Sequence, residues 1–389
     1  MSPAIPYGRQ DIDSEDIKAV IDVLSSDFLT QGPAVDAFEA AIGSYVGAQY
    51  AVACNSATSA LHLACLALGV GPGDRVWTSA ITFVASSNCA LYCGAAVDFV
   101  DIDLATYNMS MDALTEKLAI AKLSGSLPKV LIPVHMAGQS CDMQAIYALS
   151  QEYGFKVIED ASHAIGGRHR DDPIGSCNFS DITVFSFHPV KIITTGEGGM
   201  AVTNSAVLAD KMNLLRSHGI TREPTQMQGR SDGPWYYEQI DLGFNYRMTD
   251  IQAAVGLSQS KKIERYVLRR NEIAERYKSA LMDLPITLPA VLENNYSAFH
   301  LFIILLSAGI TKSRHLEVFS QLREAGIGVN IHYIPVYLQP YYQKMGFKKG
   351  YCPNAEEYYS RAISLPIFPN LSIAQQDFVA SKLSEILVS

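Results

Sequence analysis

Short apolar runs alternate with longer segments of helical or loop character through residues 50–205. Each run is rich in β-branched and aromatic residues and has the length of a buried strand, and the segments between them are long enough for helical crossovers. This alternation predicts an α/β fold with one large domain, in which helices cover a mostly parallel seven-stranded sheet. The seven runs cover residues 50–54, 75–80, 95–102, 129–134, 155–160, 182–187 and 199–204.

A helical pattern precedes this region. After Ser14, the apolar residues Ile17, Val20, Ile21 and Leu24 recur at the spacing of one helix face, and acidic residues fill the first turn. Acids stabilise the positive end of a helix, and a stripe at this spacing is typical of a helix that packs on one side. We therefore expect an N-terminal helix with a buried apolar face.

The pattern of polar and apolar residues changes after residue 255. A charged stretch with helical spacing covers residues 261–284. Helix and strand signals then alternate over shorter distances, which predicts a small α+β unit. We therefore expect a large domain over residues 1–255 and a small domain over residues 256–389. The small unit should contain a strand over 300–307, a helix that Ser313 caps and that carries Leu316, Phe319 and Leu322 before Gly326, a strand over 327–333, and a final helix after Ser372.

The bulk composition narrows the function classes. The chain has 389 residues, 48% of them apolar and 18% charged, so we expect an ordered globular protein. Its net charge of -9, without a Lys and Arg cluster, argues against a nucleic-acid partner. The first 16 residues lack a secretory pattern, and the most apolar stretch, LFIILLSAGI, is too short to span a membrane. We expect a cytoplasmic protein whose seven cysteines are buried thiols.

The segment NSATSALHLACLALG joins a strand end to a helix start. Ala57, Thr58 and Ser59 would fall in the first helical turn, where free N–H groups and hydroxyls can bind an anion such as phosphate. A helix start rich in Ser and Thr is also explained by simple capping.

The segment FKVIEDASHAIG places two acids at the end of a predicted strand. Ligands of α/β sheets lie outside such strand ends, so Glu159 or Asp160 can face a ligand, with His163 one turn further on. A carboxylate that caps the following turn is the alternative.

The segment DITVFSFHPVKIITTGEGGMAVTN places Ser186 and then Lys191 after another predicted strand. Lysines are mostly solvated, but Lys191 lies between two apolar runs and close to Gly198 and Gly199, which permit close backbone approach. Burial lowers the pKa of an amine and makes it a nucleophile. Lys191 is therefore the candidate reactive residue.

The segment DLGFNYRMTDIQAAVGLSQ carries Asn245 and Arg247 in a loop before a helix that Thr249 should cap. Arg247 has the geometry to hold a carboxylate or phosphate with two hydrogen bonds. A salt bridge to a neighbouring acid would explain it equally well.

Together and in this order, these four segments resemble the sugar aminotransferases of the aspartate-aminotransferase superfamily, the fold-type-I enzymes that use pyridoxal 5′-phosphate (PLP). The resemblance runs nearly from end to end. It implies the aspartate-aminotransferase-like fold, in which a large domain with a seven-stranded sheet carries a smaller C-terminal α+β domain. The strings ASHAIG and NIHYIPVYLQPYYQKMGF are similar to those of the transaminases that serve pseudaminic acid biosynthesis.

The resemblance also implies roles for the residues singled out above. Lys191 would carry PLP as a Schiff base and move the reaction's proton. Asp160 would pair with the pyridine nitrogen and so keep the ring an electron sink. The cofactor phosphate would be held by Ala57, Thr58 and Ser186 and by Asn245 donated from the other subunit of a homodimer.

Other positions follow from the resemblance alone. Phe83 would stack on the pyridine ring, and His163 lies where many relatives place a Gln beside the ring oxygen. The residues that would contact the substrate are Tyr7, Thr30, Arg247, His332 and Tyr333.

The reaction implied is the transfer of an amino group from L-glutamate to C4 of a UDP-linked 4-keto-6-deoxy amino sugar, giving UDP-4-amino-4,6-dideoxy-N-acetyl-β-L-altrosamine. Other acceptors remain open: a UDP-4-keto-pentose, GDP-4-keto-6-deoxymannose or a dTDP-keto-hexose. A PLP-binding regulator without turnover is a further alternative. The sugar dehydratase branch is disfavoured because it lacks the Schiff-base lysine, and a nucleotide-binding oxidoreductase is disfavoured because GVGPG, residues 69–73, follows a helix rather than a strand.

Overall fold

A seven-stranded sheet forms the centre of the computed structural model, which describes residues 4–388. Every apolar run that the sequence indicated is one of its strands. Strand β9 runs antiparallel to both its neighbours, and the other pairs are parallel, so the predicted mostly parallel sheet is confirmed. In spatial order the strands are β1 (Tyr50–Cys54), β9 (Gly199–Thr203), β8 (Ile182–Ser186), β5 (Lys156–Asp160), β4 (Val130–Ile132), β2 (Arg75–Ser79) and β3 (Ala96–Val100).

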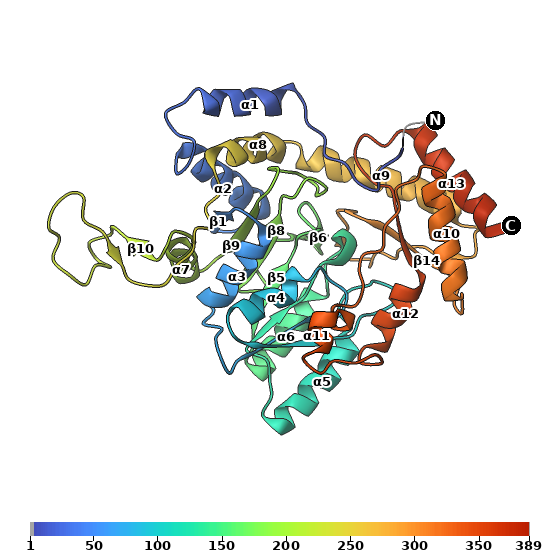
Figure 1. Ribbon diagram of the computed structural model, residues 1–389, viewed down its shortest axis with the longest axis horizontal. Helices are drawn as coiled ribbons and strands as arrows, with labels where there is room; N and C mark the ends of the chain where they lie inside the picture. Colours follow the sequence, from blue (N-terminus) through green and yellow to red (C-terminus); the bar gives the residue numbers. More distant parts are fainter. Residues whose placement is uncertain (1–3, 389) are drawn as a thin grey trace.

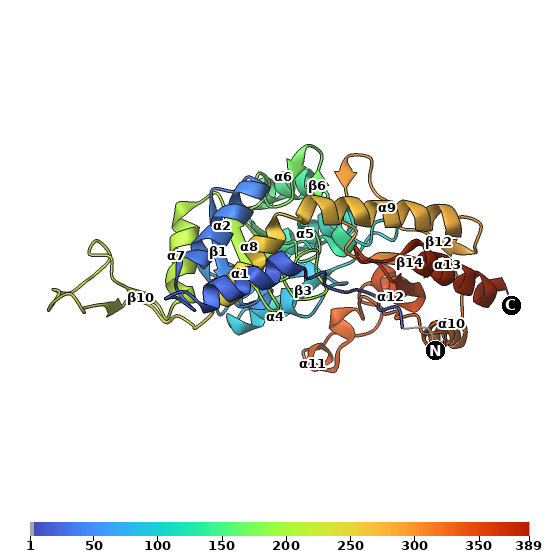
Figure 2. The ribbon, with the colours of Figure 1, turned by 90° about the horizontal axis from the view of Figure 1, so that it is seen from above.

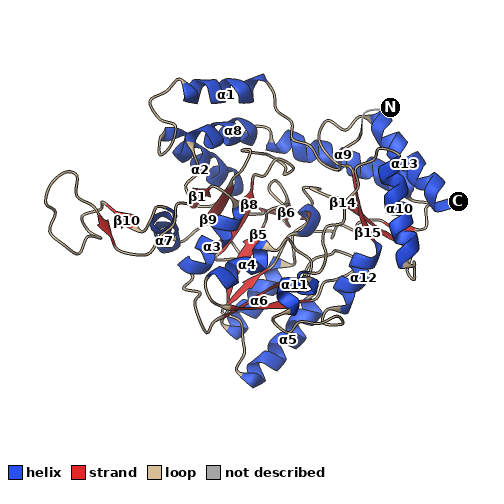
Figure 3. Cartoon of the chain, in the orientation of Figure 1, coloured by secondary structure: helices blue, strands red, loops and turns tan. Residues whose placement is uncertain are grey.

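Helices enclose this sheet (Figure 3). Strands β8 and β9 are buried at every position, including the hydroxyl residues Thr183 and Ser186 of β8. The helices of this part are α2 (Pro33–Val46), α3 (Ala57–Ala67), α4 (Ala85–Tyr92), α5 (Met111–Ser124), η1 (Met136–Gly138), α6 (Met143–Tyr153), α7 (Ala206–Arg216) and α8 (Asp250–Ser260). As expected, Thr249 caps α8, and all seven cysteines are buried.

The N-terminal helix α1 (Ser14–Leu24) forms where the pattern predicted it, with Asp13 as its cap, but the apolar stripe is not buried. Ile17, Ile21 and Leu24 are 55%, 55% and 56% exposed. The buried residue of this helix is Asp16, which Lys262 contacts at 2.9 Å. The prediction that the apolar face of this helix is buried is therefore wrong within one chain. The ion pair between Asp16 and Lys262 holds the polar side of α1 against the rest of the protein, so the apolar side faces outward.

A second, smaller sheet lies at the other end of the molecule (Figure 1). It pairs β12 (Ile286–Thr287), β14 (Phe302–Leu306) and β15 (Ala362–Leu365). Its core includes Ile5 from the N-terminal segment, so both ends of the chain contribute to it. The helices of this part are α9 (Ile263–Leu281), α10 (Lys312–Glu324), η2 (Val336–Leu338), α11 (Pro340–Gln343), α12 (Pro353–Arg361) and α13 (Ile373–Val388).

Three details of the small unit differ from expectation. Thr311, not Ser313, caps α10, because its side chain accepts the N–H of Arg314. Leu316 is exposed, and Val318 and Leu322 are the apolar residues that α10 buries. Residues 327–333 form only isolated bridges, at Ile327 and Asn330, and not a strand. The domain boundary at residues 255 and 256 stays a prediction, and it lies inside α8.

A two-stranded hairpin extends away from the rest of the molecule (Figure 2). It consists of β10 (Ile220–Thr221) and β11 (Glu238–Gln239), and its connecting segment exposes Trp235 and Tyr237. The remaining short strands, β6 (Arg168–His169), β7 (Asp172–Pro173) and β13 (Asn295–Tyr296), pair with one another. Within residues 4–388 no helix combines the length and the apolar character that a membrane span requires.

Candidate active site

A cavity of about 470 Å³ opens beyond the carboxyl ends of β5 and β8. Such an edge is where α/β sheets bind ligands. Ten residues that the sequence indicated line it together: Tyr7, Ala57, Thr58, Phe83, Asp160, His163, Ser186, Lys191, His332 and Tyr333. The wall also contains Ser56, Leu61, Thr82, Ala85, Val134, Ser162, His188, Val190, Glu197, His300 and Asn330, which sequence reasoning did not assign to a site.

The N-terminus of α3 forms one wall of the cavity. Ser56 caps this helix by accepting the N–H of Ser59, which leaves the N–H groups of Ala57 and Thr58 in the first turn as free donors. Gly199 lies directly against this turn, since a side chain there would place its Cβ 2.3 Å from the nitrogen of Ala57. The glycine thus lets β9 approach the helix start, and the wall can bind an anion through helix N–H groups and hydroxyls.

Asp160 ends β5 and points its carboxylate into the same cavity. One oxygen accepts a 2.6 Å hydrogen bond from Ser86, and the other accepts the N–H of Ser162 at 3.1 Å. Both contacts donate to the carboxylate, one to each oxygen. The side chain is almost fully buried, and the two donors fix its orientation.

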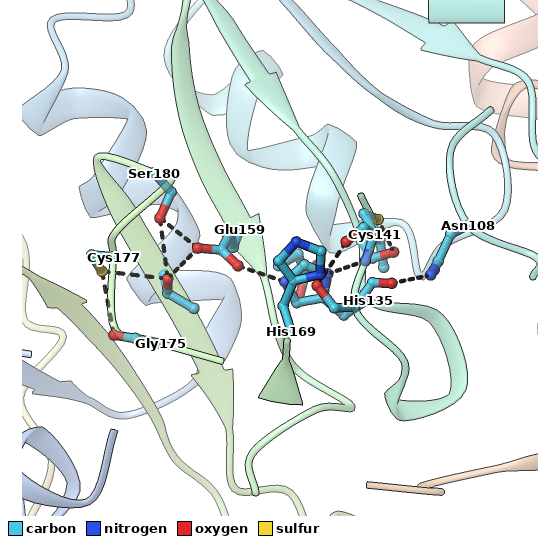
Figure 4. A network of polar contacts seen from close by, with 12 residues as sticks. Asn108, His135, Cys141, Glu159, His169, Gly175, Cys177 and Ser180 are labelled. Carbon is cyan, nitrogen blue, oxygen red and sulfur yellow. Dashed lines mark hydrogen bonds and ion pairs between the residues drawn. The ribbon is translucent and has the colours of Figure 1, made fainter. Parts of the chain in front are cut away.

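A second acid, Glu159, anchors the same strand from within the sheet (Figure 4). Its carboxylate accepts hydrogen bonds from His135, Ser180 and Thr183. Burial acts to raise the pKa of Glu159, but these hydrogen bonds outweigh it and lower the pKa. Because the backbone N–H of His135 also donates to the carbonyl of Asp160 at 3.1 Å, this network fixes the strand end that carries the candidate catalytic acid.

Lys191 is half-buried in the loop after β8. Burial lowers its pKa to about 8, and the nearby charge of Asp160 opposes that shift. An amine with this pKa is partly unprotonated near neutral pH and can act as a nucleophile. The mechanism of activation that the sequence suggested, desolvation, is the one that the structure provides.

A second wall of the cavity is built largely from histidine and tyrosine. His163 Nε2 and Tyr333 Oη lie 3.1 Å apart, and the rings of His163 and His300 have centroids 4.4 Å apart. His332 is held by Ser364, whose hydroxyl lies 2.8 Å from Nδ1. Burial lowers the pKa of His332 to about 4 and brings those of His163 and His300 well below the usual histidine value. This wall is therefore uncharged at neutral pH.

Three residues expected at the site do not line this cavity within one chain. Thr30 pairs with Thr249, Asn245 pairs with Ser217, and Arg247 donates to the Ser217 hydroxyl at 2.9 Å. Arg247 also forms a bridge with Cys54, at the carboxyl end of β1, so this loop runs beside the edge of the sheet without lining the cavity. The salt bridge considered for Arg247 is replaced by this hydroxyl contact.

His300 is the main residue that sequence reasoning missed. It precedes the buried run of β14, and the segment was interpreted only as a strand. The available signal was a histidine at the polar start of that run, which by itself does not distinguish a site residue from a core residue.

The sequence profile of the DegT/DnrJ/EryC1/StrS aminotransferase family matches residues 10–384. The chain belongs to this family. Two relatives illustrate the likeness: the spore coat polysaccharide biosynthesis protein SpsC of Bacillus subtilis is 40% identical, covering 98% of this chain and 97% of the relative. The UDP-4-amino-4,6-dideoxy-N-acetyl-beta-L-altrosamine transaminase of Campylobacter jejuni is 36% identical, covering 98% of this chain and 97% of the relative.

Solved structures agree with this assignment. Helicobacter pylori PseC, an aminotransferase involved in the biosynthesis of pseudoaminic acid, superimposes with a TM-score of 0.90 at 32% identity over 99% of both chains. The PLP-form of the Streptococcus pneumoniae protein Spr1654 gives a TM-score of 0.89 at 29% identity, also over 99% of both chains. The expected fold-type-I architecture is confirmed, and the chain is a PLP-dependent aminotransferase.

The residues of the cavity fit this cofactor. In this aminotransferase the start of α3 would hold the phosphate, the buried carboxylate of Asp160 the ring nitrogen, the low-pKa amine of Lys191 the aldehyde, and the ring of Phe83 the flat face. PLP, when bound, supplies an electron sink for the substrate carbon that exchanges nitrogen.

Proposed function

We propose that this aminotransferase moves the amino group of L-glutamate to the C4 ketone of a UDP-linked 4-keto-6-deoxy amino sugar, UDP-2-acetamido-2,6-dideoxy-β-L-arabino-hexos-4-ulose. Glutamate leaves as 2-oxoglutarate, and the ketone oxygen of the sugar is replaced by the amine. The observation that carries the proposal is the end-to-end likeness to the Campylobacter jejuni transaminase and to PseC, combined with a cavity in which the lysine and the acid lie together.

The large-domain side of the cavity would perform the chemistry. Lys191, whose pKa of about 8 makes it available both as nucleophile and as acid, would bind the cofactor and then carry the proton to and from the reacting carbon. Asp160 would hold a proton on the ring nitrogen, and Ser86 and Ser162 would keep its carboxylate in place. The start of α3 and Ser186 would bind the cofactor phosphate.

A homodimer would complete the site. Among the described residues that line the cavity, Lys191 is the one lysine and none is an arginine, although PLP, a nucleotide diphosphate and glutamate all carry negative charge. Asn245, Arg247 and Thr30 lie outside the cavity of their own chain. We propose that a second copy brings Asn245 to the cofactor phosphate, and that Thr30 and Arg247 serve the substrate in the same way.

A panel of acceptors tests the function. The purified enzyme would be incubated with PLP, L-glutamate and one keto sugar at a time, and mass spectrometry would follow conversion of ketone to amine alongside 2-oxoglutarate. We expect amination of the UDP-linked 4-keto-6-deoxy amino sugar, in equal amount with 2-oxoglutarate. Reaction with only a UDP-4-keto-pentose, GDP-4-keto-6-deoxymannose or a dTDP-keto-hexose would refute the proposed acceptor, and cofactor binding without any amination would favour the regulator.

A further inference from the structure

Two histidine nitrogens in the cavity wall lack a hydrogen-bond partner. Among the described residues, Nδ1 of His163 and Nδ1 of His300 are both fully enclosed and unpaired. Buried polar groups are nearly always paired in folded proteins, so each exception needs a reason. A phenylalanine at either position would fill the space without this cost, which indicates that the other nitrogen of each ring has a use.

The unpaired atoms indicate which nitrogen carries the proton. An enclosed N–H without an acceptor is rarer and costlier than an enclosed lone pair without a donor. Both rings should therefore keep the lone pair on Nδ1 and the hydrogen on Nε2. In His163 that hydrogen then points to Tyr333 Oη, which lies 3.1 Å away.

Tyr333 becomes a donor toward the cavity as a result. Its oxygen accepts from His163, so its own hydrogen is free for another acceptor, and the residue lines the cavity. Burial and the nearby charge of Asp160 raise its pKa, so the phenol keeps its proton. The hydroxyl is thus oriented by the histidine behind it.

His300 offers a second donor of the same kind. Its Nε2 has no protein partner in the described part of the chain but is not enclosed, and its ring lines the cavity beside His163. The backbone that carries it is fixed, because the Arg270 guanidinium donates to the carbonyls of Phe299, His300 and Ile367 at 3.1–3.2 Å. A neutral N–H is therefore held at a defined place.

His332 differs from His163 and His300 in that both of its ring nitrogens have partners within the protein. Nδ1 lies 2.8 Å from the Ser364 hydroxyl, and Nε2 faces the Asn330 amide nitrogen at 3.4 Å. Both of its nitrogens are engaged within the protein, so it has no free hydrogen for a ligand. Of the three histidines on this wall, His300 is the one that has a free donor.

The acceptor substrate matches such donors better than the amino donor does. A keto sugar presents neutral oxygens, whereas glutamate presents two carboxylates that cations bind more strongly. Resting on the proposed function, we propose that Tyr333 and His300 are a pair of neutral hydrogen-bond donors that recognise oxygens of the keto-sugar acceptor, with His163 as the residue that positions Tyr333.

A role in recognising the sugar can be distinguished from a general role in catalysis, because the glutamate and the sugar half-reactions can be measured separately. Single turnovers would be followed by cofactor absorbance, first with L-glutamate and then with the UDP-linked 4-keto-6-deoxy amino sugar as probe. We expect His300→Phe and Tyr333→Phe each to lower kcat/KM of the sugar half-reaction about 10- to 100-fold and to change the glutamate half-reaction less than about threefold. His315→Phe and Tyr341→Phe make the same chemical changes outside the cavity and should leave both unchanged.

Equal losses in both half-reactions, or no loss in either, would overturn the inference. If the wild-type enzyme reacts with glutamate but not with the probe, the proposed acceptor is wrong. In that case the tautomers of His163 and His300 still test whether Tyr333 and His300 are hydrogen-bond donors toward the cavity. Nitrogen NMR of ¹⁵N-histidine-labelled protein, with resonances assigned through His163→Gln and His300→Phe, should show hydrogen on Nε2 and a bare Nδ1 in both rings. Hydrogen on Nδ1 of either ring would contradict it.

Discussion

The two walls of the cavity differ in chemistry. One wall, called here the reactive wall, carries the ionisable pair Lys191 and Asp160 and the start of α3, which together suit a charged, reactive cofactor. The other wall, which His163, His300, His332 and Tyr333 build, is neutral at physiological pH, as the sugar recognition that we propose for it requires. Asp160 and Lys191 come from the segments that end β5 and follow β8, whereas three of the four neutral residues come from residues 300–333, so substitutions can change one set without changing the other.

The strongest test of the reactive wall is Lys191→Ala. We expect the variant to fold but to lose at least about 10⁴-fold in kcat, because nucleophile and proton carrier are removed together. Borohydride reduction of wild-type enzyme with PLP, followed by peptide mapping, should place the label on the peptide that contains Lys191. Lys156→Ala, on the surface beside Asp181, serves as the control. A label on another lysine would disprove the assignment.

Asp160→Asn tests the acid of the same wall. An amide carries no negative charge, so we expect the glutamate half-reaction to slow by about 100- to 1000-fold, the equivalent of two to three pKa units at the ring nitrogen. Ser86→Ala, which removes one hydrogen bond to this carboxylate, should cost less than about tenfold. Stopped-flow absorbance measures both rates. Asp210→Asn, on the exposed side of α7, should match the wild type, and an Asp160→Asn rate within tenfold of wild type would remove Asp160 from the mechanism.

Lowering the pH tests whether the histidine wall is held neutral, because a buried neutral His332 should make the folded protein less stable in acid. The pKa of His332 is about 4 in the folded protein and about 6.5 when unfolded, so below pH 6.5 the unfolded chain binds the proton first. Stability should fall as pH decreases from about 6.5 to 4, with about 3 kcal/mol due to this residue. Urea unfolding at several pH values should show a shallower decline for His332→Gln than for wild type or for the exposed His188→Gln. An unchanged decline would mean that His332 is not held neutral.

The smallest effect concerns the second copy that we propose to complete the site. If the outward stripe of α1 packs against a second copy, Ile21→Ala should weaken dimerisation roughly tenfold, whereas Glu15→Gln on the same helix should not. Sedimentation velocity over a range of protein concentrations measures this. Equal dissociation of both variants would place the interface elsewhere.

Much of the reactive wall could be predicted from the sequence. Asp160 and Ser186 end buried strands, and the start of α3 follows another, so local patterns were enough to bring these residues to one edge of the sheet. Lys191 was recognisable because glycines and apolar runs surround it. The α1 stripe was identified correctly, but its burial was not, because the pairing of Asp16 with Lys262 joins residues about 250 positions apart.

The sequence by itself determined the strands of the central sheet, the family and the residues of the reactive wall, since these depend on short-range periodicity and on motifs along the chain. Only the tertiary structure decided which histidines have free nitrogens. His163, His300 and His332 come from three separate segments, and their protonation depends on burial and on partners such as Tyr333 and Ser364. It also decided that Asn245 and Arg247 lie outside the cavity of their own chain, because the path of a loop around β1 has no local sequence signal.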